Sequence, residues 1–338
     1  MQTIKDVAAR AGVSDRTVSR VVNGEPNISK KTRVRVEEAI AELNYIPNLA
    51  ARMVRTNRSG VLGVITDVVS TTPNSVDLIR GIQDRISTSG QSILIANTSG
   101  TLEEENKVWR TFREHRIDGV LYATMYHRGI DFDPEAHAIP TVLVNCFAEG
   151  RDDVPAVLPD DYGGEEGATA YLIAAGHSRI GYITLNPAII AARLRRQAFE
   201  DVMRKHDLAV HATWVTSGYE GPEGGESICA YEVVREILSA PPGERPTALL
   251  SGDDEIAMQS IFAAMSLGLK VPDDIAIVGF DDFQMISTRT VPRLTTVALP
   301  YYEIGLRAAD KLLAMLAGEA DDEVVERLPC PLVRRESA

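Results

Sequence analysis

Beyond Val61 the sequence alternates short apolar runs, rich in β-branched residues, with longer segments of helical periodicity. Continuous apolar strands joined by crossover helices are typical of parallel sheets that helices cover on both faces. The alternation is too long for one such sheet, so we predict two lobes. The expected strands are 61–68, 91–98, 118–124, 140–147, 180–185, 247–252 and 275–280, and the expected helices are 76–89, 102–115, 162–175, 194–206, 227–239 and 254–267.

The first 58 residues differ from the rest of the chain in charge. They carry eleven Lys and Arg against six Asp and Glu, whereas the whole chain of 338 residues has a net charge of −13. The remainder is therefore strongly acidic. A small basic segment joined to an acidic body favours a module that binds a polyanion, fused to a domain with another task.

Three short helices are expected in this basic segment. Thr3 and Asp6 are spaced as a capping box, and Ser14 is placed to cap a second helix. Ser29 is placed to cap a third helix, which Pro47 ends. A Gly/Pro/Asn-rich loop, "NGEPNIS", separates the last two helices.

The second helix lies in "AGVSDRTVSRVVNG", residues 11–24. Val18, Val21 and Val22 fall on one face at helical spacing, and polar side chains occupy the other face. Two helices joined by a Gly-containing turn, with arginines on the polar face of the second, predict a helix-turn-helix. Its polar face would meet base edges in the major groove, although an amphipathic surface hairpin would show a similar pattern.

Other function classes find less support. Paired carboxylates, in "SGDDE" and "GFDDF", could serve a sugar-modifying enzyme as acid and base, but adjacent side chains on a strand end face opposite ways. The sequence shows no metal-ligand cluster, P-loop or nucleophile elbow, so we expect no enzyme, cofactor or metal. Cys146, Cys229 and Cys330 are widely spaced and predicted to be reduced thiols. No apolar run is long enough for a membrane span and no signal region is seen, so we expect a cytoplasmic protein.

Longer motifs extend this interpretation to nearly the whole chain. The segments "TIKDVAARAGVSDRTVSRVVNG", "TRVRVEEAIAELNYIPN" and "AARMVRT" resemble the DNA-binding head of the LacI/GalR transcription regulators. "RGIQD", "GHSRIGYI", "IAIVGFDD" and "RLTTV" resemble motifs in the body of that family. The resemblance implies a homodimeric repressor that binds a palindromic double-stranded operator, sits on the nucleoid when bound, and responds allosterically to a small carbohydrate.

The resemblance also implies a domain order. An all-α helix-turn-helix head is expected at 1–45 and a hinge helix at 46–58. The body should be α/β, with two Rossmann-like lobes arranged as in periplasmic binding proteins. We expect the first lobe to comprise 59–159 with 298–320 and the second 161–296 with 323–338, the chain crossing near 159–161, 296–299 and 319–323.

The same resemblance implies that the second helix recognises the DNA sequence. The residues implied to contact bases are Asp15, Arg16 and Arg20, and those implied to contact the DNA backbone are Ser14, Thr17, Ser19, Asn23 and Tyr45. Arginine presents a fork to guanine O6 and N7, whereas hydroxyl and amide groups suit phosphate oxygens. Asp15 is unusual at its position, where it either accepts from a cytosine amine or orients Arg16.

The hinge of the family inserts apolar side chains into a minor-groove step. Met53 and Val54 occupy the matching positions, and either could be the wedge. Valine is shorter than the leucine most common there, which leaves the depth of the kink open. The alternative is that both side chains pack within a linker.

In this family the effector binds between the lobes. Asp281 and Arg195 match its principal ligand contacts, and Asn145, Asp253 and Tyr219 match further pocket positions. Ligands of open α/β sheets bind at the carboxyl ends of strands, although each side chain could instead be a helix cap or a salt bridge at the lobe junction.

The loop after the first strand bears on the size of that effector. It reads "STTPNSV", residues 70–76, where the family usually has Asn-Pro-Phe-Phe. Its expected ligand contacts are Thr71, Thr72, Asn74 and Ser75. The loss of two aromatic residues predicts a wider, more polar cleft, which favours a disaccharide such as sucrose as inducer. A regulator that needs a purine as corepressor is the alternative.

Overall fold

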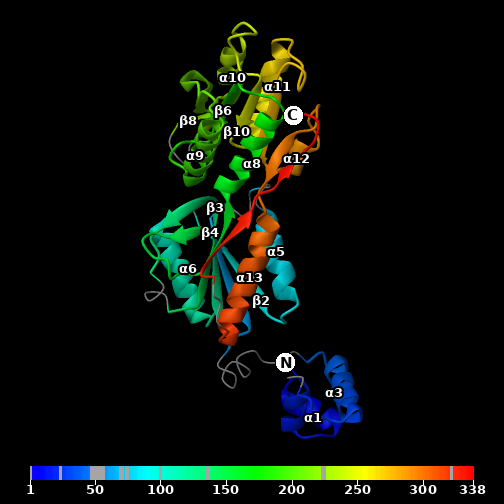
Figure 1. Ribbon diagram of the computed structural model, residues 1–338. Coiled ribbons are helices and arrows are strands. Elements are labelled where there is room, and N and C mark those ends of the chain that lie inside the picture. Colours follow the sequence, from blue (N-terminus) through cyan, green and yellow to red (C-terminus); the bar gives the residue numbers. More distant parts are fainter. Residues whose placement is uncertain are drawn as a thin grey trace. The chain divides into compact units, whose positions relative to one another are not determined.

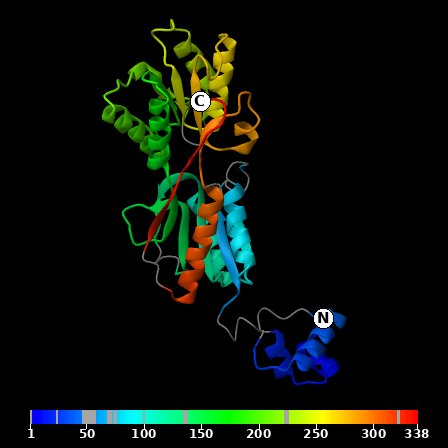
Figure 2. The same cartoon turned by 45° about the vertical axis from the view of Figure 1, so that its right-hand side comes forward.

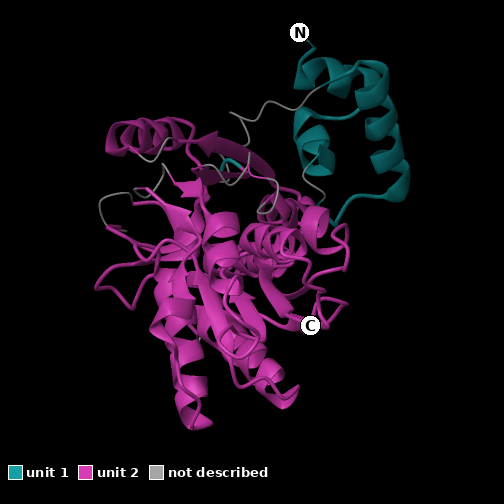
Figure 3. Ribbon diagram, turned by 90° about the horizontal axis from the view of Figure 1, so that it is seen from above, with its two compact units in different colours: residues 1–59 teal, residues 60–338 magenta. Residues whose placement is uncertain are grey.

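The computed structural model (Figures 1 and 2) describes residues 2–22, 25–45, 58–67, 72, 76–98, 101–133, 138–221, 226–319 and 323–338. The chain divides into two compact units, Met1–Ser59 and Gly60–Ala338 (Figure 3). Among the described residues, no helix is both long enough and apolar enough to span a membrane. The expected hinge, with Met53 and Val54, lies outside the described residues, as do Asn23, Thr71, Asn74 and Ser75.

The first unit contains three helices, α1 (Ile4–Ala11), α2 (Asp15–Val22) and α3 (Lys30–Glu42). The predicted capping box at Thr3 and the predicted cap at Ser29 are both confirmed. Gly12 ends α1 with a φ of +62°, a left-handed conformation that glycine adopts without the steric cost of a Cβ. The buried core of this unit is formed by Val7, Ala8, Ala11, Val18, Val21, Val36 and Ala39.

The second unit begins with a parallel sheet of six strands in the order β13-β5-β4-β3-β1-β2. These strands are β1 (Val61–Thr66), β2 (Ser92–Asn97), β3 (Gly119–Ile130), β4 (Thr141–Ala148), β5 (Ala156–Asp160) and β13 (Val325–Pro329). Helices α5 (Val76–Ser87) and α13 (Tyr301–Ala317) cover one face and α6 (Leu102–Glu114) the other. Gly81 and Gly305 let α5 and α13 pack closely, because a Cβ at either position would collide with the opposite backbone.

A second sheet has the strand order β14-β12-β11-β10-β6-β7. Its strands are β6 (Ile180–Thr184), β7 (Val215–Ser217), β10 (Ala248–Ser251), β11 (Ala276–Asp281), β12 (Thr295–Ala298) and the antiparallel β14 (Leu332–Val333). One face is covered by α8 (Asp161–Ala174) and α9 (Ile190–Lys205), the other by α10 (Ala230–Leu238) and α11 (Asp254–Ser266). The remaining elements are a 3-10 turn (Ala212–Trp214), the hairpin β8 (Tyr219–Glu220) and β9 (Ser227–Ile228), and α12 (Gln284–Ser287).

Every strand and helix expected between residues 61 and 280 is present, with most ends shifted by a few residues, although β3 continues to Ile130, six residues beyond its expected end; all three cysteines are free. One predicted boundary is wrong. The third crossing was expected at 319–323, but β13 pairs in parallel with β5 at the edge of the first sheet, from Val325 beside Ala156 to Pro329 beside Asp160. The chain therefore reaches the second sheet only between β13 and β14, near Cys330. The crossing was placed too early because β13 is half-exposed and carries charged residues, so its sequence does not indicate a strand. Its position is decided by pairing with the edge strand β5.

Candidate functional site

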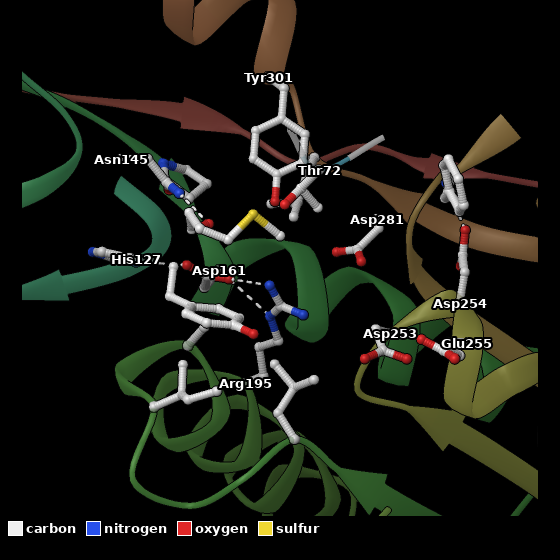
Figure 4. Close-up of a pocket in the computed structure, with 18 of the residues that line it drawn as sticks. Thr72, His127, Asn145, Asp161, Arg195, Asp253, Asp254, Glu255, Asp281 and Tyr301 are labelled. Carbon is white, nitrogen blue, oxygen red and sulfur yellow. Dashed lines mark hydrogen bonds and ion pairs between the residues drawn. The ribbon is translucent and has the colours of Figure 1, made fainter. Parts of the chain in front are cut away.

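A cavity of about 440 Å³ lies between the two sheets of the second unit. Strand ends surround it: Asn145 comes from the last part of β4, Asp281 ends β11, and Asp253 follows β10. Figure 4 shows these side chains around the same space as Arg195 and Tyr301. The structure thus brings together the described sequence-predicted effector residues, which are Thr72, Asn145, Arg195, Tyr219, Asp253 and Asp281.

Arg195, on α9, is 3% exposed and tightly held. Its Nε and Nη2 each lie 2.7 Å from Oδ1 of Asp161, and Nη1 donates to the carbonyl of Gly252 at 2.6 Å. The guanidinium also lies 3.5 Å from the centre of the Phe280 ring. Aromatic stacking and an ion pair together fix a charge that burial would otherwise disfavour.

Asp161 links this arginine to the first lobe. It is the first residue of α8, and its second oxygen, Oδ2, lies 2.7 Å from Nδ1 of His127 on β3. Burial alone would raise the pKa of Asp161, but the Arg195 charge and the hydrogen bonds from His127 and Arg195 outweigh it and hold that pKa below its ordinary value. A buried chain of three side chains therefore connects β3 of one lobe to α9 of the other.

Asp253 and Asp281 are the acidic side of the cavity. Asp253 is the N-cap of α11, with Oδ1 accepting from the Ile256 amide at 2.7 Å, and its Oδ2 accepts from the Tyr219 hydroxyl at 2.8 Å. The carboxylate of Asp281 makes no ion pair or hydrogen bond with the described residues and faces the cavity (Figure 4). Burial raises the pKa of Asp281 well above its ordinary value, and the neighbouring Asp253 raises it further, although Arg195 opposes both.

Two pocket residues have strained backbones. Asn145 has a φ of +60° and Asp281 a φ of +119°. Residues held in sparsely populated conformations cluster at functional sites, and asparagine tolerates positive φ better than most residues. The Asn145 amide donates to the carbonyls of Thr124 and Met125 at 3.0 Å each, so it also supports the bulge in β3.

Apolar and aromatic residues also line the cavity. They are Met125, Leu185, Ile189, Phe283, Ile286, Leu299 and Tyr301. Carboxylate, guanidinium and hydroxyl groups, together with aliphatic and aromatic groups, match the two kinds of surface on a sugar ring. The site thus offers polar groups for hydroxyls and apolar contacts for C–H faces.

The sequence did not identify every residue of this site. Asp161 directly follows a strand at the first lobe crossing, so its position at a strand end is a signal that could have found it. Met125, Tyr126 and His127 lie within the irregular stretch of β3 between Ala123 and Arg128, and no local pattern marks that irregularity. Tyr301 opens a helix that is not among those expected.

The expected DNA-reading face of α2 is partly exposed. Asp15, Arg16 and Ser14 are exposed, and the Ser14 hydroxyl accepts from the Thr17 amide at 3.2 Å as a helix cap. Arg20 is half-buried and pairs with Glu25 at 2.7 Å. Thr17 and Ser19 are half-buried on the same helix.

Tyr45 follows α3 and is half-buried in the first unit, where it packs against the core of the head.

Glu165, one turn after Asp161 on α8, is 1% exposed, and its Oε1 has no hydrogen-bond partner among the described residues. Burial raises its pKa to about 8, although the Arg195 charge opposes this. The folded state therefore keeps a proton that the unfolded chain loses near pH 4.5. Stability should fall as pH rises from about 4.5 to about 8 and then level off, because the unfolded state binds fewer protons in that window.

We expect Glu165→Gln to remove this part of the pH dependence, which is on the order of 4 kcal/mol. Urea unfolding at about pH 5 and about pH 8 measures it, with the parent protein losing more stability than the variant between the two. Equal losses in both proteins would show that Glu165 is not the group that titrates.

Two family profiles match the chain. Residues 3–48 match bacterial regulatory proteins of the lacI family, and residues 169–338 match a periplasmic binding protein-like domain. The chain is 34% identical to the ribose operon repressor of Escherichia coli (strain K12), over 93% of this chain and 92% of that protein. It is 33% identical to the sucrose operon repressor of Shigella flexneri over 99% of each. It is also 30% identical to the transcriptional repressor PurR of Serratia proteamaculans (strain 568), over 100% and 97%.

Solved structures agree with these matches. A putative LacI-family regulator from Rhizobium etli is 47% identical with a TM-score of 0.78, over 83% of this chain and 99% of that one. The lac repressor dimer bound to operator and the anti-inducer ONPF is 27% identical with a TM-score of 0.79, over 99% and 98%. The CelR–cellobiose complex is 26% identical with a TM-score of 0.67 over the whole of both chains. The chain therefore belongs to the LacI family and is a DNA-binding transcriptional repressor.

Proposed function

We propose that this repressor leaves its operator when a small carbohydrate, of disaccharide rather than monosaccharide size, binds in the cavity between its lobes. One observation carries the proposal: Arg195, Asp253 and Asp281 of the second lobe meet Asn145 of the first around one cavity. Sugar hydroxyls both donate and accept hydrogen bonds, so they suit carboxylate, guanidinium and amide groups together.

The size of the effector is inferred from two further points. The volume of about 440 Å³ lies within the usual range for small-molecule sites, and the loop at 70–76 has no aromatic side chain to fill it. Among similar proteins, one is named for the sucrose operon and another is solved with cellobiose, and both sugars are disaccharides. Other relatives are a ribose operon repressor and the repressor PurR, so a monosaccharide and a purine are the alternative ligands to test.

The switch follows from the position of the cavity between the lobes. A ligand that contacts both lobes favours one closure of the lobes over another, and only such a difference can shift the equilibrium. The closure would set the separation of the two hinges of a dimer, and hinges held too far apart cannot fold together on the minor groove. Coupling of this kind is typically about 1–3 kcal/mol, or roughly 5- to 150-fold in operator affinity.

A homodimer through the body is part of this proposal, since one three-helix head makes few DNA contacts. Exposed apolar side chains support it: Leu94 and Ile95 on the edge strand β2, and Phe262 and Met265 on α11. Exposed apolar strands and patches on monomers commonly mark interfaces. Sedimentation at micromolar concentration is expected to show a dimer, and a monomer with full operator affinity would refute it.

For DNA recognition we propose that α2 enters the major groove, with Asp15, Arg16 and Arg20 at base edges. Ser14, Thr17, Ser19, Asn23 and Tyr45 would hold the DNA backbone. Met53 or Val54 would wedge into a central minor-groove step and bend a roughly palindromic operator. Arg20 must then leave Glu25 to reach a base, whereas Arg16 is already exposed and unpaired with the described residues.

Arg16→Ala is therefore expected to cost about 1–3 kcal/mol of specific binding and to relax the preference at one base per half-site. Anisotropy with a set of singly substituted duplexes, at fixed salt, measures both effects. Arg35→Ala, an exposed arginine on α3, is the control for loss of charge and should leave sequence preference unchanged. If Arg16→Ala weakened every duplex equally, Arg16 would be a phosphate contact.

The test of the effector class is a thermal-shift panel of monosaccharides, disaccharides and purines with the full chain. A ligand that binds only the folded state raises the free energy of unfolding by mass action, by about 2.7 kcal/mol at a hundredfold excess over Kd, and the unfolding midpoint rises with it. We expect disaccharides to raise it most. A panel in which only purines do so would support the corepressor alternative and refute this proposal.

A further inference from the structure

The charges that line the cavity are unbalanced. Among the described lining residues, the basic side chains are Arg195 and His127, and both already contact Asp161. The remaining ionisable carboxyls of the lining are Asp253, Asp254, Glu255 and Asp281. A ligand that enters therefore meets more carboxyl groups than basic groups. The arginine that it meets, Arg195, is already paired with a carboxylate.

The parts of the second unit outside the described residues do not alter this balance. They comprise 68–71, 73–75, 99–100, 134–137, 222–225 and 320–322, and their sequences contain neither lysine nor arginine. The loop at 70–76, which is expected to contact the ligand, is uncharged. No further lysine or arginine can therefore come from these segments to neutralise an anionic ligand.

The carboxyls differ in the hydrogen bonds that they already accept from the protein. Asp254 accepts from the Thr296 hydroxyl at 2.5 Å and from the Phe283 amide at 2.7 Å, so it serves the fold. Asp253 caps α11 and accepts from Tyr219. Asp281 alone of these three has no such partner among the described residues, and it faces the cavity (Figure 4).

We propose that the cavity selects its effector by charge: it rejects carbohydrates that carry phosphate or carboxylate and favours one that carries a basic nitrogen near Asp281. An anion would be brought close to unneutralised carboxyls in a partly dehydrated site, where like charges repel strongly. An ammonium group would instead add positive charge beside Asp281 and Asp253, because the nearby Arg195 is already paired with Asp161. This inference rests on the proposed function, because it concerns the ligand of the same cavity.

The electrostatics of the site agree with this inference. Burial raises the pKa of Asp281 and of Asp253, so the positive charge near these carboxylates does not offset their loss of hydration. An ammonium group bound beside them would supply further positive charge and favour their ionised form.

The experiment compares ligands that differ only in charge, by calorimetry with the full chain. The disaccharide probes are cellobiose, fully deacetylated chitobiose and cellobiouronic acid. The monosaccharide probes are glucose, glucosamine, glucuronate and glucose 6-phosphate. We expect each amine to bind at least tenfold more tightly than its neutral counterpart and each anion at least tenfold more weakly.

Asp281→Asn provides the matched variant, because asparagine keeps the shape and tolerates positive φ. It should reduce the preference for amine over neutral sugar at least tenfold, while Asp273→Asn, on an exposed loop, should leave it unchanged. Tightest binding of an anion would overturn the inference and leave the proposed function intact. Equal affinity for amine and neutral sugars would also overturn it. If no carbohydrate of either set bound, the proposed function would fail and the inference with it.

Discussion

Replacing Arg195 with methionine is expected to lower the free energy of unfolding of the body by about 3–5 kcal/mol. The substitution leaves Asp161, whose side chain is 0% exposed, as a buried carboxylate without its principal counter-charge. It also removes the hydrogen bond to the Gly252 carbonyl and the stacking on Phe280. Urea unfolding near neutral pH measures the loss.

The next residue supplies the control. Arg196 lies on the exposed side of α9, where it pairs with Glu200, and their side chains are 53% and 35% exposed. Exposed pairs of this kind contribute about 0–1 kcal/mol, so Arg196→Met should be nearly neutral. If Arg195→Met were as stable as Arg196→Met, the buried pair of Arg195 and Asp161 would not stabilise the body as predicted.

Asp281→Asn is expected to weaken carbohydrate binding roughly 10- to 150-fold, because a hydrogen bond to a charged group contributes about 1.5–3 kcal/mol. The fold should tolerate the change, since the Asp281 carboxylate has no partner among the described residues and asparagine tolerates positive φ. Operator affinity without ligand should stay that of the parent protein. Calorimetry and operator anisotropy on the same preparation measure the two quantities.

The exposed Asp273 again provides the control, as Asp273→Asn removes the same charge far from any cavity-lining position. It should alter neither ligand affinity nor operator affinity. If Asp281→Asn responded to carbohydrate as the parent protein does, Asp281 would not be a ligand contact. The proposal would then lose its main polar contact.

The fold was largely predictable because its strands are continuous apolar runs separated by helical patterns. The missing pieces are those whose signals are not local. β13 is a half-exposed edge strand whose place is decided by pairing with β5, more than a hundred residues earlier in the chain. α13 differs from β13, because its apolar residues Ile304, Ala308 and Leu312 do recur at helical spacing, and only its place against α5 depends on a distant element.

The site was predictable to a similar degree. Side chains at strand ends, such as Asp253 and Asp281, follow from the general position of ligands in α/β sheets. The interactions of these side chains within the protein could not be predicted. Asp253 is both a pocket residue and a helix cap, and Arg195, another pocket residue, is already bound to Asp161. His127 could not be found from the sequence, because its role depends on a contact with a residue of another element.

The central claim is that occupancy of the cavity between the lobes lowers operator affinity. The direct measurement is fluorescence anisotropy of a labelled palindromic duplex, selected from a random library with the full chain, titrated at fixed salt with and without the tightest-binding carbohydrate of the panel. We predict that the carbohydrate weakens operator binding roughly 5- to 150-fold in the parent protein. In Asp281→Asn the same concentration should have little effect. Operator binding that is unchanged or tightened by a carbohydrate bound in the cavity would contradict the account.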